Sequence, residues 1–249
     1  MSTAGINWFK YSSPATFYPL AGRMIPWFAA LAVVSAVAGL YLGFFVAPPD
    51  YQQGDAYRIM FIHVPAAWMS MFIYVVMAGY AALGLIFNTR LSAMMASALA
   101  PTGAMFTFLA LWTGALWGKP MWGTWWVWDA RLTSELILLF LYIGYMSLEA
   151  AIDDPRRASR ASGLLAIVGV VNVPIIYYSV QWWNTLHQGA SISFDKAPTM
   201  AATMLAALLV MTFACWMYAI AIVLMRVRNI ILERERHSEW VMGVLEEEK

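Results

Sequence analysis

The sequence predicts an all-α, polytopic membrane protein with six transmembrane helices and both termini in the cytoplasm. Three observations support this. The chain of 249 residues is 62% hydrophobic and only 12% charged, whereas a soluble domain usually carries about 25% charged residues. Apolar runs of about twenty residues, the length that spans a bilayer, recur along the chain. The positive charges gather on alternate connections between these runs. We expect residues 1–249 to form one membrane domain.

The first two apolar runs are expected to be membrane helices. The run at 25–46 exceeds the roughly 7–15-residue core of a secretory signal, so we expect it to be retained in the membrane. Proline is tolerated in the first turn of a helix. His63 and Pro65 therefore mark the start of a second helix that continues to residue 87.

Four further helices and a polar tail complete the predicted fold. They are expected at residues 91–113, 134–152, 162–180 and 200–225. Asn172 and Pro174 interrupt the fifth helix. The tail at 226–249 alternates charged and apolar residues, which is typical of a short helix, and we place it in the cytoplasm.

The distribution of Lys and Arg sets the orientation, because cytoplasmic connections carry an excess of both. With both termini inside, the outer connections hold Arg58, Lys119, Arg131 and Lys196. The inner segments hold the other eleven of the fifteen cations, namely Lys10, Arg23, Arg90, Arg156, Arg157, Arg160, Arg226, Arg228, Arg234, Arg236 and Lys249. The same orientation places His63, His187 and the segment 114–133 together on the outer face.

The segment 114–133 is rich in tryptophan. Indole rings commonly line membrane interfaces, but one or two per helix end suffice for such a belt. Stacked indoles also form a wide apolar platform, and the spacing of Trp122, Trp125 and Trp126 would place these three on one face of a short helix. Asp129 follows and is expected to cap the next helix or to orient a neighbouring donor. The five tryptophans within twelve residues are Trp117, Trp122, Trp125, Trp126 and Trp128.

The pair His63 and His187 beside this platform indicates a haem site. Neutral imidazole is a common axial ligand of haem iron. Either histidine alone would equally fit a capping or hydrogen-bonding role at the interface. Cys215 is the one cysteine and no C-x-x-C-H is present, so the expected ligand is non-covalent haem b. His237 lies in the charged tail and is expected to be solvated.

Three outer cations are candidates for contacts to the haem propionates. Guanidinium groups bind carboxylates in a bidentate manner, which favours Arg58 and Arg131, and Lys119 lies in the same region. Contact with solvent or with lipid headgroups is the alternative for each of them.

Several functions lack their sequence signatures. There is no G-x-x-x-x-G-K-[ST] motif for ATP hydrolysis. No nucleophile–base arrangement and no nucleic-acid-binding signature is present. Five of the predicted helices carry no charge deep in the membrane, which disfavours an ion relay. We therefore expect a binding subunit that is not itself an enzyme, with any ATP hydrolysis on a separate subunit.

The segment WGKPMWGTWWVWDARLTSE resembles the "WWD" signature of haem-handling proteins, and the whole chain resembles the CcmC family, haem exporter protein C of bacterial cytochrome c maturation. The resemblance implies that His63 and His187 are axial ligands and that Arg58 is the family's first-loop arginine. The residues that match the family's tryptophan motif are Trp117, Trp122, Trp125, Trp126, Trp128 and Asp129.

The resemblance also implies a cellular role. Family members lie in the inner membrane, hold haem at the periplasmic face and transfer it to the haem chaperone CcmE. They act in an ABC-type complex with the ATPase CcmA and the membrane subunits CcmB and CcmD. Two alternatives remain: a cytochrome c haem lyase of the same superfamily, which forms the thioether bond itself, and a structural transporter subunit that binds no haem.

Overall fold

The computed structural model describes residues 8–187, 192 and 197–247. Within this part the chain is helical, and six segments are long and apolar enough to cross a membrane. The predicted all-α fold with six membrane-spanning segments is therefore confirmed. These segments are Pro14–Val46, Asp55–Phe87, Arg90–Trp122, Ala130–Ala151, Pro155–Trp182 and Ala202–Arg234.

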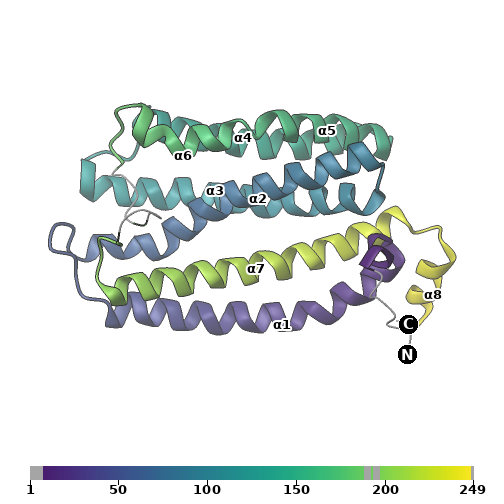
Figure 1. Cartoon of the computed structure of the whole chain (residues 1–249), viewed down its shortest axis with the longest axis horizontal. Coiled ribbons are helices and arrows are strands. Elements are labelled where there is room, and N and C mark those ends of the chain that lie inside the picture. Colours follow the sequence, from purple (N-terminus) through teal and green to yellow (C-terminus); the bar gives the residue numbers. More distant parts are fainter. Residues whose placement is uncertain (1–7, 188–191, 193–196, 248–249) are drawn as a thin grey trace.

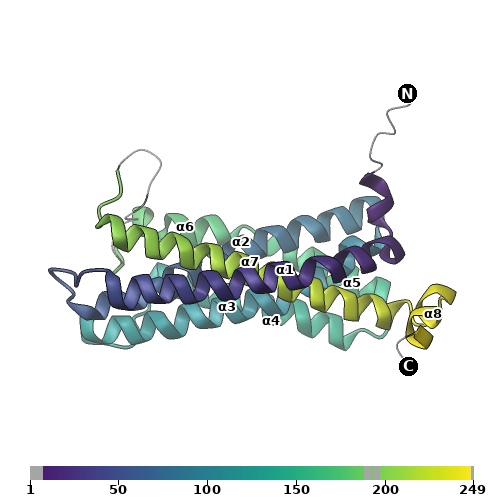
Figure 2. The same cartoon turned by 90° about the horizontal axis from the view of Figure 1, so that it is seen from below.

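The helices pack in three layers (Figure 1). In one outer layer α1 (Pro14–Tyr41) packs along α7 (Ala202–Arg234). The middle layer is α2 (Met60–Phe87) against α3 (Arg90–Trp122). The other outer layer contains α4 (Ala130–Ala151), α5 (Pro155–Gly169) and α6 (Asn172–Trp182). The short helix α8 (Glu239–Glu247) and the start of α1 lie at one end of the bundle, and the α3–α4 connection lies at the other (Figure 1, Figure 2).

Close contacts between rings and small residues hold the middle layer to α4. The buried rings of Tyr74 and Tyr142 meet edge to face, with centroids 5.0 Å apart. A Cβ atom at Gly103 would overlap the Tyr142 ring, so glycine is needed there for α3 and α4 to approach. The Tyr142 hydroxyl donates to the Ser70 carbonyl oxygen at 2.8 Å. These contacts join α2, α3 and α4 near the middle of the three helices.

Several helices are longer than their apolar runs predict. The first begins at Pro14 rather than residue 25, and the last ends at Arg234 rather than 225. The predicted limits followed hydropathy, whereas the backbone hydrogen bonds continue through the polar residues at both ends. The predicted break in the fifth segment is confirmed between Gly169 and Asn172. The predicted short helix in the tail is confirmed as α8.

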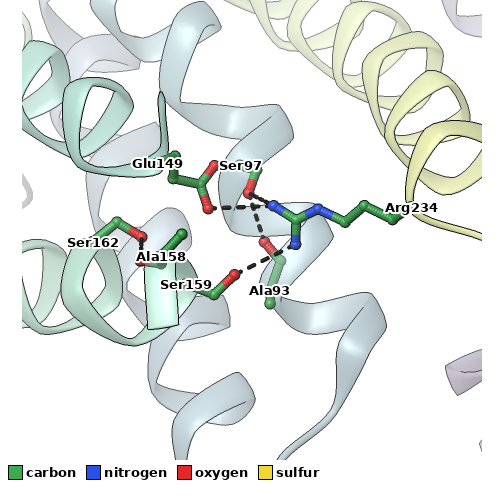
Figure 3. A network of polar contacts seen from close by, with 7 residues as sticks. All are labelled: Ala93, Ser97, Glu149, Ala158, Ser159, Ser162 and Arg234. Atoms are coloured by element: carbon green, nitrogen blue, oxygen red, sulfur yellow. Dashed lines mark hydrogen bonds and ion pairs between the residues drawn. The ribbon is translucent and has the colours of Figure 1, made fainter. Parts of the chain in front are cut away.

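A polar cluster ties α7 to the two other layers (Figure 3). The Arg234 guanidinium lies 3.4 Å from a Glu149 carboxylate oxygen on α4. It also donates to the hydroxyls of Ser97 on α3 at 3.3 Å and Ser159 on α5 at 3.4 Å. One side chain of α7 thus contacts three other helices.

Replacing this arginine should loosen the bundle. We expect Arg234→Ala to lower the free energy of unfolding by about 1–3 kcal/mol, because a mostly buried carboxylate and two hydroxyls lose their donor. Thermal unfolding of the purified protein in detergent measures the change. Arg236→Ala is the matched control, since the exposed Arg236 guanidinium contacts the adjacent His237 in the turn between α7 and α8. Equal melting temperatures for the two variants would contradict the assignment.

Candidate functional site

A pocket opens at the end of the bundle that carries the α3–α4 connection. It brings together five residues that the sequence singled out: both outer histidines, two tryptophans and Arg131. Its walls come from the starts of α2 and α4, the end of α3 and the segment after α6. The lining residues are His63, Ala67, Ala110, Leu111, Gly114, Ala115, Trp122, Trp126, Arg131, Leu132, Glu135 and His187.

His63 is held by α3. It lies in the first turn of α2, and its Nδ1 is 3.0 Å from the Ala110 carbonyl oxygen and 3.1 Å from the Thr113 hydroxyl oxygen. A carbonyl only accepts, so Nδ1 carries the proton and the Nε2 lone pair stays available. A Cβ at Gly114 would lie 3.0 Å from the imidazole Cε1. The ring is therefore fixed in both tautomer and position.

His187 reaches the pocket from the segment that follows α6 (Asn172–Trp182). Its ring meets Trp122 edge to face, with centroids 5.0 Å apart. Within the described residues its buried Nδ1 has no hydrogen-bond partner. Burial, reinforced by the nearby positive charge of Arg131, lowers the pKa of His187 to about 4. The imidazole is consequently neutral near pH 7 and has an uncommitted ring nitrogen.

The tryptophan segment does not form the short helix on which Trp122, Trp125 and Trp126 would share one face. Trp122 ends α3, and Gly123 then adopts a left-handed conformation, φ +75°, which glycine tolerates best. The residues up to Asp129 are non-helical. Trp126 turns into the pocket with a buried indole N–H that has no partner among the described residues. Trp125 and Trp128 are exposed.

The remaining tryptophan, Trp117, packs against His63, which lines the pocket. It lies on α3, and its ring meets the His63 ring edge to face at 5.7 Å between centroids. Its indole N–H donates to the Gln53 side-chain oxygen at 2.9 Å. Trp117 thus links His63 to the connection between α1 and α2.

Asp129 joins two walls of the pocket. Its carboxylate accepts the Leu132 amide at 2.8 Å and so caps α4, as predicted. The second oxygen accepts the backbone N–H of Leu186, next to His187, at 3.3 Å. One side chain therefore fixes the start of α4 and also the segment that carries the second histidine.

Of the three predicted propionate-binding cations, only Arg131 lines the pocket. Its guanidinium donates to the Ile176 carbonyl oxygen on α6 at 2.7 Å. Arg58 lies elsewhere, donating to the Gly43 and Ala47 carbonyl oxygens at the end of the first span and to Asp55. Lys119 donates to the Gly123 carbonyl oxygen at 3.1 Å and lies over the Trp125 ring.

Glu135 is a pocket residue that the sequence analysis did not single out. It lies one turn after Arg131 on α4 and is only 7% exposed. The Ser70 hydroxyl on α2 lies 2.7 Å from its carboxylate. An acidic residue inside an apolar helix is costly and usually functional, and that signal would have identified it.

An apolar groove adjoins the pocket and shares Leu111 and Trp126 with it. It runs between α3 and α4 along the side of the bundle. The pocket is therefore bordered by a surface that lipid tails can cover. The side chains that line the groove are Phe108, Leu111, Trp112, Trp126, Trp128, Leu136 and Leu139.

Removing Asp129 should free the second histidine. We expect Asp129→Ala to cost about 1 kcal/mol of stability through the lost cap and to expose His187 to modification by diethyl pyrocarbonate in the ligand-free protein. Asp154→Ala is the control, because Asp154 caps α5 through the Arg157 amide at 2.7 Å. It should cost similar stability without changing His187 reactivity. Peptide mass spectrometry measures that reactivity, and equal rates in both variants would contradict the tether.

Known proteins resemble this chain over nearly its whole length. The family model described as CcmC, Heme exporter protein C, matches residues 7–242. The chain is 50% identical to Heme exporter protein C of Escherichia coli over 233 residues, covering 93% of this chain and 94% of that protein. It is 46% identical to the protein of that name from Haemophilus influenzae, covering 94% and 95%. For the Bradyrhizobium diazoefficiens protein the values are 50%, 93% and 88%. This chain belongs to the CcmC family.

Proposed function

We propose that this protein binds haem b non-covalently in the pocket between His63 and His187 and presents it to another protein. The observation that supports the proposal is that two imidazoles, both able to bind iron in their neutral form, and two indoles line one pocket. The names of the relatives, Heme exporter protein C, point to the same ligand. The protein acts as a haem-handling subunit and not as an enzyme.

The two histidines ligate the iron from opposite faces of the porphyrin. The hydrogen bonds that Nδ1 of His63 makes to α3 leave Nε2 to face the metal, as in metal sites where the second ring nitrogen is held by a carbonyl. His187 has no such partner on Nδ1. It supplies the second ligand from the segment after α6, which Asp129 holds through the Leu186 amide.

The tryptophans and cations hold the rest of the ligand. Trp122 and Trp126 contact the macrocycle, while Trp117, Trp125, Trp128 and Asp129 complete and support the platform. Arg131 is the cation in the pocket and binds a propionate. Arg58 and Lys119 are further propionate contacts in this proposal, and they would have to exchange their present carbonyl partners for the ligand.

We place the haem site at the periplasmic face of the bacterial inner membrane, with both termini in the cytoplasm. The excess of Lys and Arg on the opposite connections supports this orientation. Haem passes from the site to the chaperone CcmE during cytochrome c biogenesis. The ATPase CcmA and the membrane subunits CcmB and CcmD complete the complex, and release requires a second state of the complex that binds haem less tightly.

Substituting the histidines tests the proposal. We expect His63→Ala and His187→Ala each to change the absorption spectrum of the purified protein from that of a bis-imidazole haem and to lower the haem content, because one axial ligand is lost. His237→Ala, in the exposed tail, is the control and should leave both unchanged. If both pocket variants keep the wild-type spectrum and haem content, the axial assignment is wrong.

The pH dependence of haem loading provides a separate check. Iron binds only neutral imidazole, and His187 has its pKa lowered to about 4. Loading of the ligand-free protein should therefore stay constant from neutral pH down to about pH 5 and fall only as the pH approaches 4. An ordinary histidine would lose its affinity near pH 6.5. Absorbance titrations with haem across this range, with circular dichroism to verify folding, distinguish the two cases.

A further inference from the structure

Among the described residues that line the pocket, Glu135 is the one that is acidic, and the proposed function gives it no role. It lies in the second turn of α4 and is almost fully buried. Among the described residues it takes part in no ion pair within 4 Å, in contrast to Glu149 on the same helix. A membrane span rarely retains such a group unless another charge compensates it.

A hydrogen-bond network holds the carboxyl group of Glu135 in place. Ser70 lies two turns after His63 on the same face of α2, and its hydroxyl is 2.7 Å from a Glu135 oxygen. The Ser70 carbonyl oxygen accepts the Tyr142 hydroxyl at 2.8 Å. The acid is therefore held toward α2, in the lining of the same pocket as both histidines.

The charge of a bis-imidazole haem core changes with the oxidation state of its iron. The ferric porphyrin core carries one positive charge and the ferrous core is neutral, propionates aside. In a poorly solvated site a nearby carboxylate stabilises the ferric state more than the ferrous one. The positive charge of Arg131, one turn away on α4, favours the ferrous state instead. A propionate bound to Arg131 offsets part of that effect.

We propose that Glu135 supplies the counter-charge for the iron of bound haem and favours the ferric state by lowering its midpoint potential. This inference rests on the proposed haem site and adds a role to a residue outside the axial and propionate contacts. Glu135 does not ligate the metal. It acts through the electrostatic potential that its carboxylate produces at the iron.

Glu135→Gln tests the inference with little change in shape. The glutamine oxygen can still accept from Ser70, so the link between α2 and α4 is kept while the charge is lost. The midpoint potential of the haem-loaded protein, measured by spectroelectrochemistry, should rise by an amount equal to at least a tenfold change in the one-electron reduction equilibrium, about 59 mV.

Glu149→Gln is the matched control. It removes the same charge from the same helix fourteen residues away, about 21 Å along the axis, and should leave the potential unchanged. Ser70→Ala keeps the charge but removes its hydrogen bond, so a purely structural role for Glu135 would shift the potential of this variant and leave that of Glu135→Gln unchanged. The inference requires the potential of Ser70→Ala to stay closer to that of the wild type.

The outcomes separate this inference from the proposed function. A haem-loaded Glu135→Gln with a wild-type spectrum and an unchanged potential would overturn the inference alone. Wild-type protein that takes up no haem would overturn the proposed function. If Glu135→Gln fails to accumulate, wild-type protein labelled with ¹³C-glutamate and loaded with unlabelled haem replaces it. Its infrared difference spectrum on reduction should contain a labelled carboxyl signal, and the absence of that signal overturns the inference.

Discussion

The contact between α2 and α3 is the constraint on which the site depends. His63 lies in the pocket because α3 offers it a carbonyl and a hydroxyl and, at Gly114, enough room for the ring. A larger residue at position 114 would push the imidazole away from α3 and break those bonds. The position of the first histidine is thus set by helix packing. The second histidine depends on Asp129, which reaches from the cap of α4 to the segment after α6.

Asp129 also explains why the tryptophan segment is not helical. A helix that ran from α3 through Trp126 would leave no free chain to turn back and begin α4. Gly123 ends α3, and Asp129 starts α4 with a side-chain cap, so the five residues between them cross the end of the pocket in an extended path. That path lets one indole enter the pocket while its neighbours face outward. The tryptophan segment is therefore a non-helical connection whose indole rings point in different directions. A short helix would have placed three of them on one face.

Hydropathy and residue spacing were enough to predict the six spans, the break in the fifth and the gathering of His63, His187 and the tryptophans at one end. Several helix ends were mispredicted, because hydrogen-bonded turns continue beyond the apolar runs, as they do before position 25 and after position 225. The surroundings of the arginines could not be predicted either. Arg58 and Arg131 look alike in the sequence, but one lies against the end of the first span and the other in the pocket. Glu135 was passed over although an acidic residue in an apolar helix is itself a signal; only its hydrogen bond to Ser70, sixty-five residues away, could not be predicted.

The ligand-free pocket keeps polar groups unpaired. The Nδ1 atom of His187 and the indole N–H of Trp126 are both buried without partners in the described structure, and each such group costs about 1–3 kcal/mol. Both of these groups belong to residues that line the pocket. A ligand that supplies partners or replaces water at these groups gains the corresponding free energy on binding. Under the proposed function, release then requires a second arrangement of the complex in which these groups bind haem less tightly.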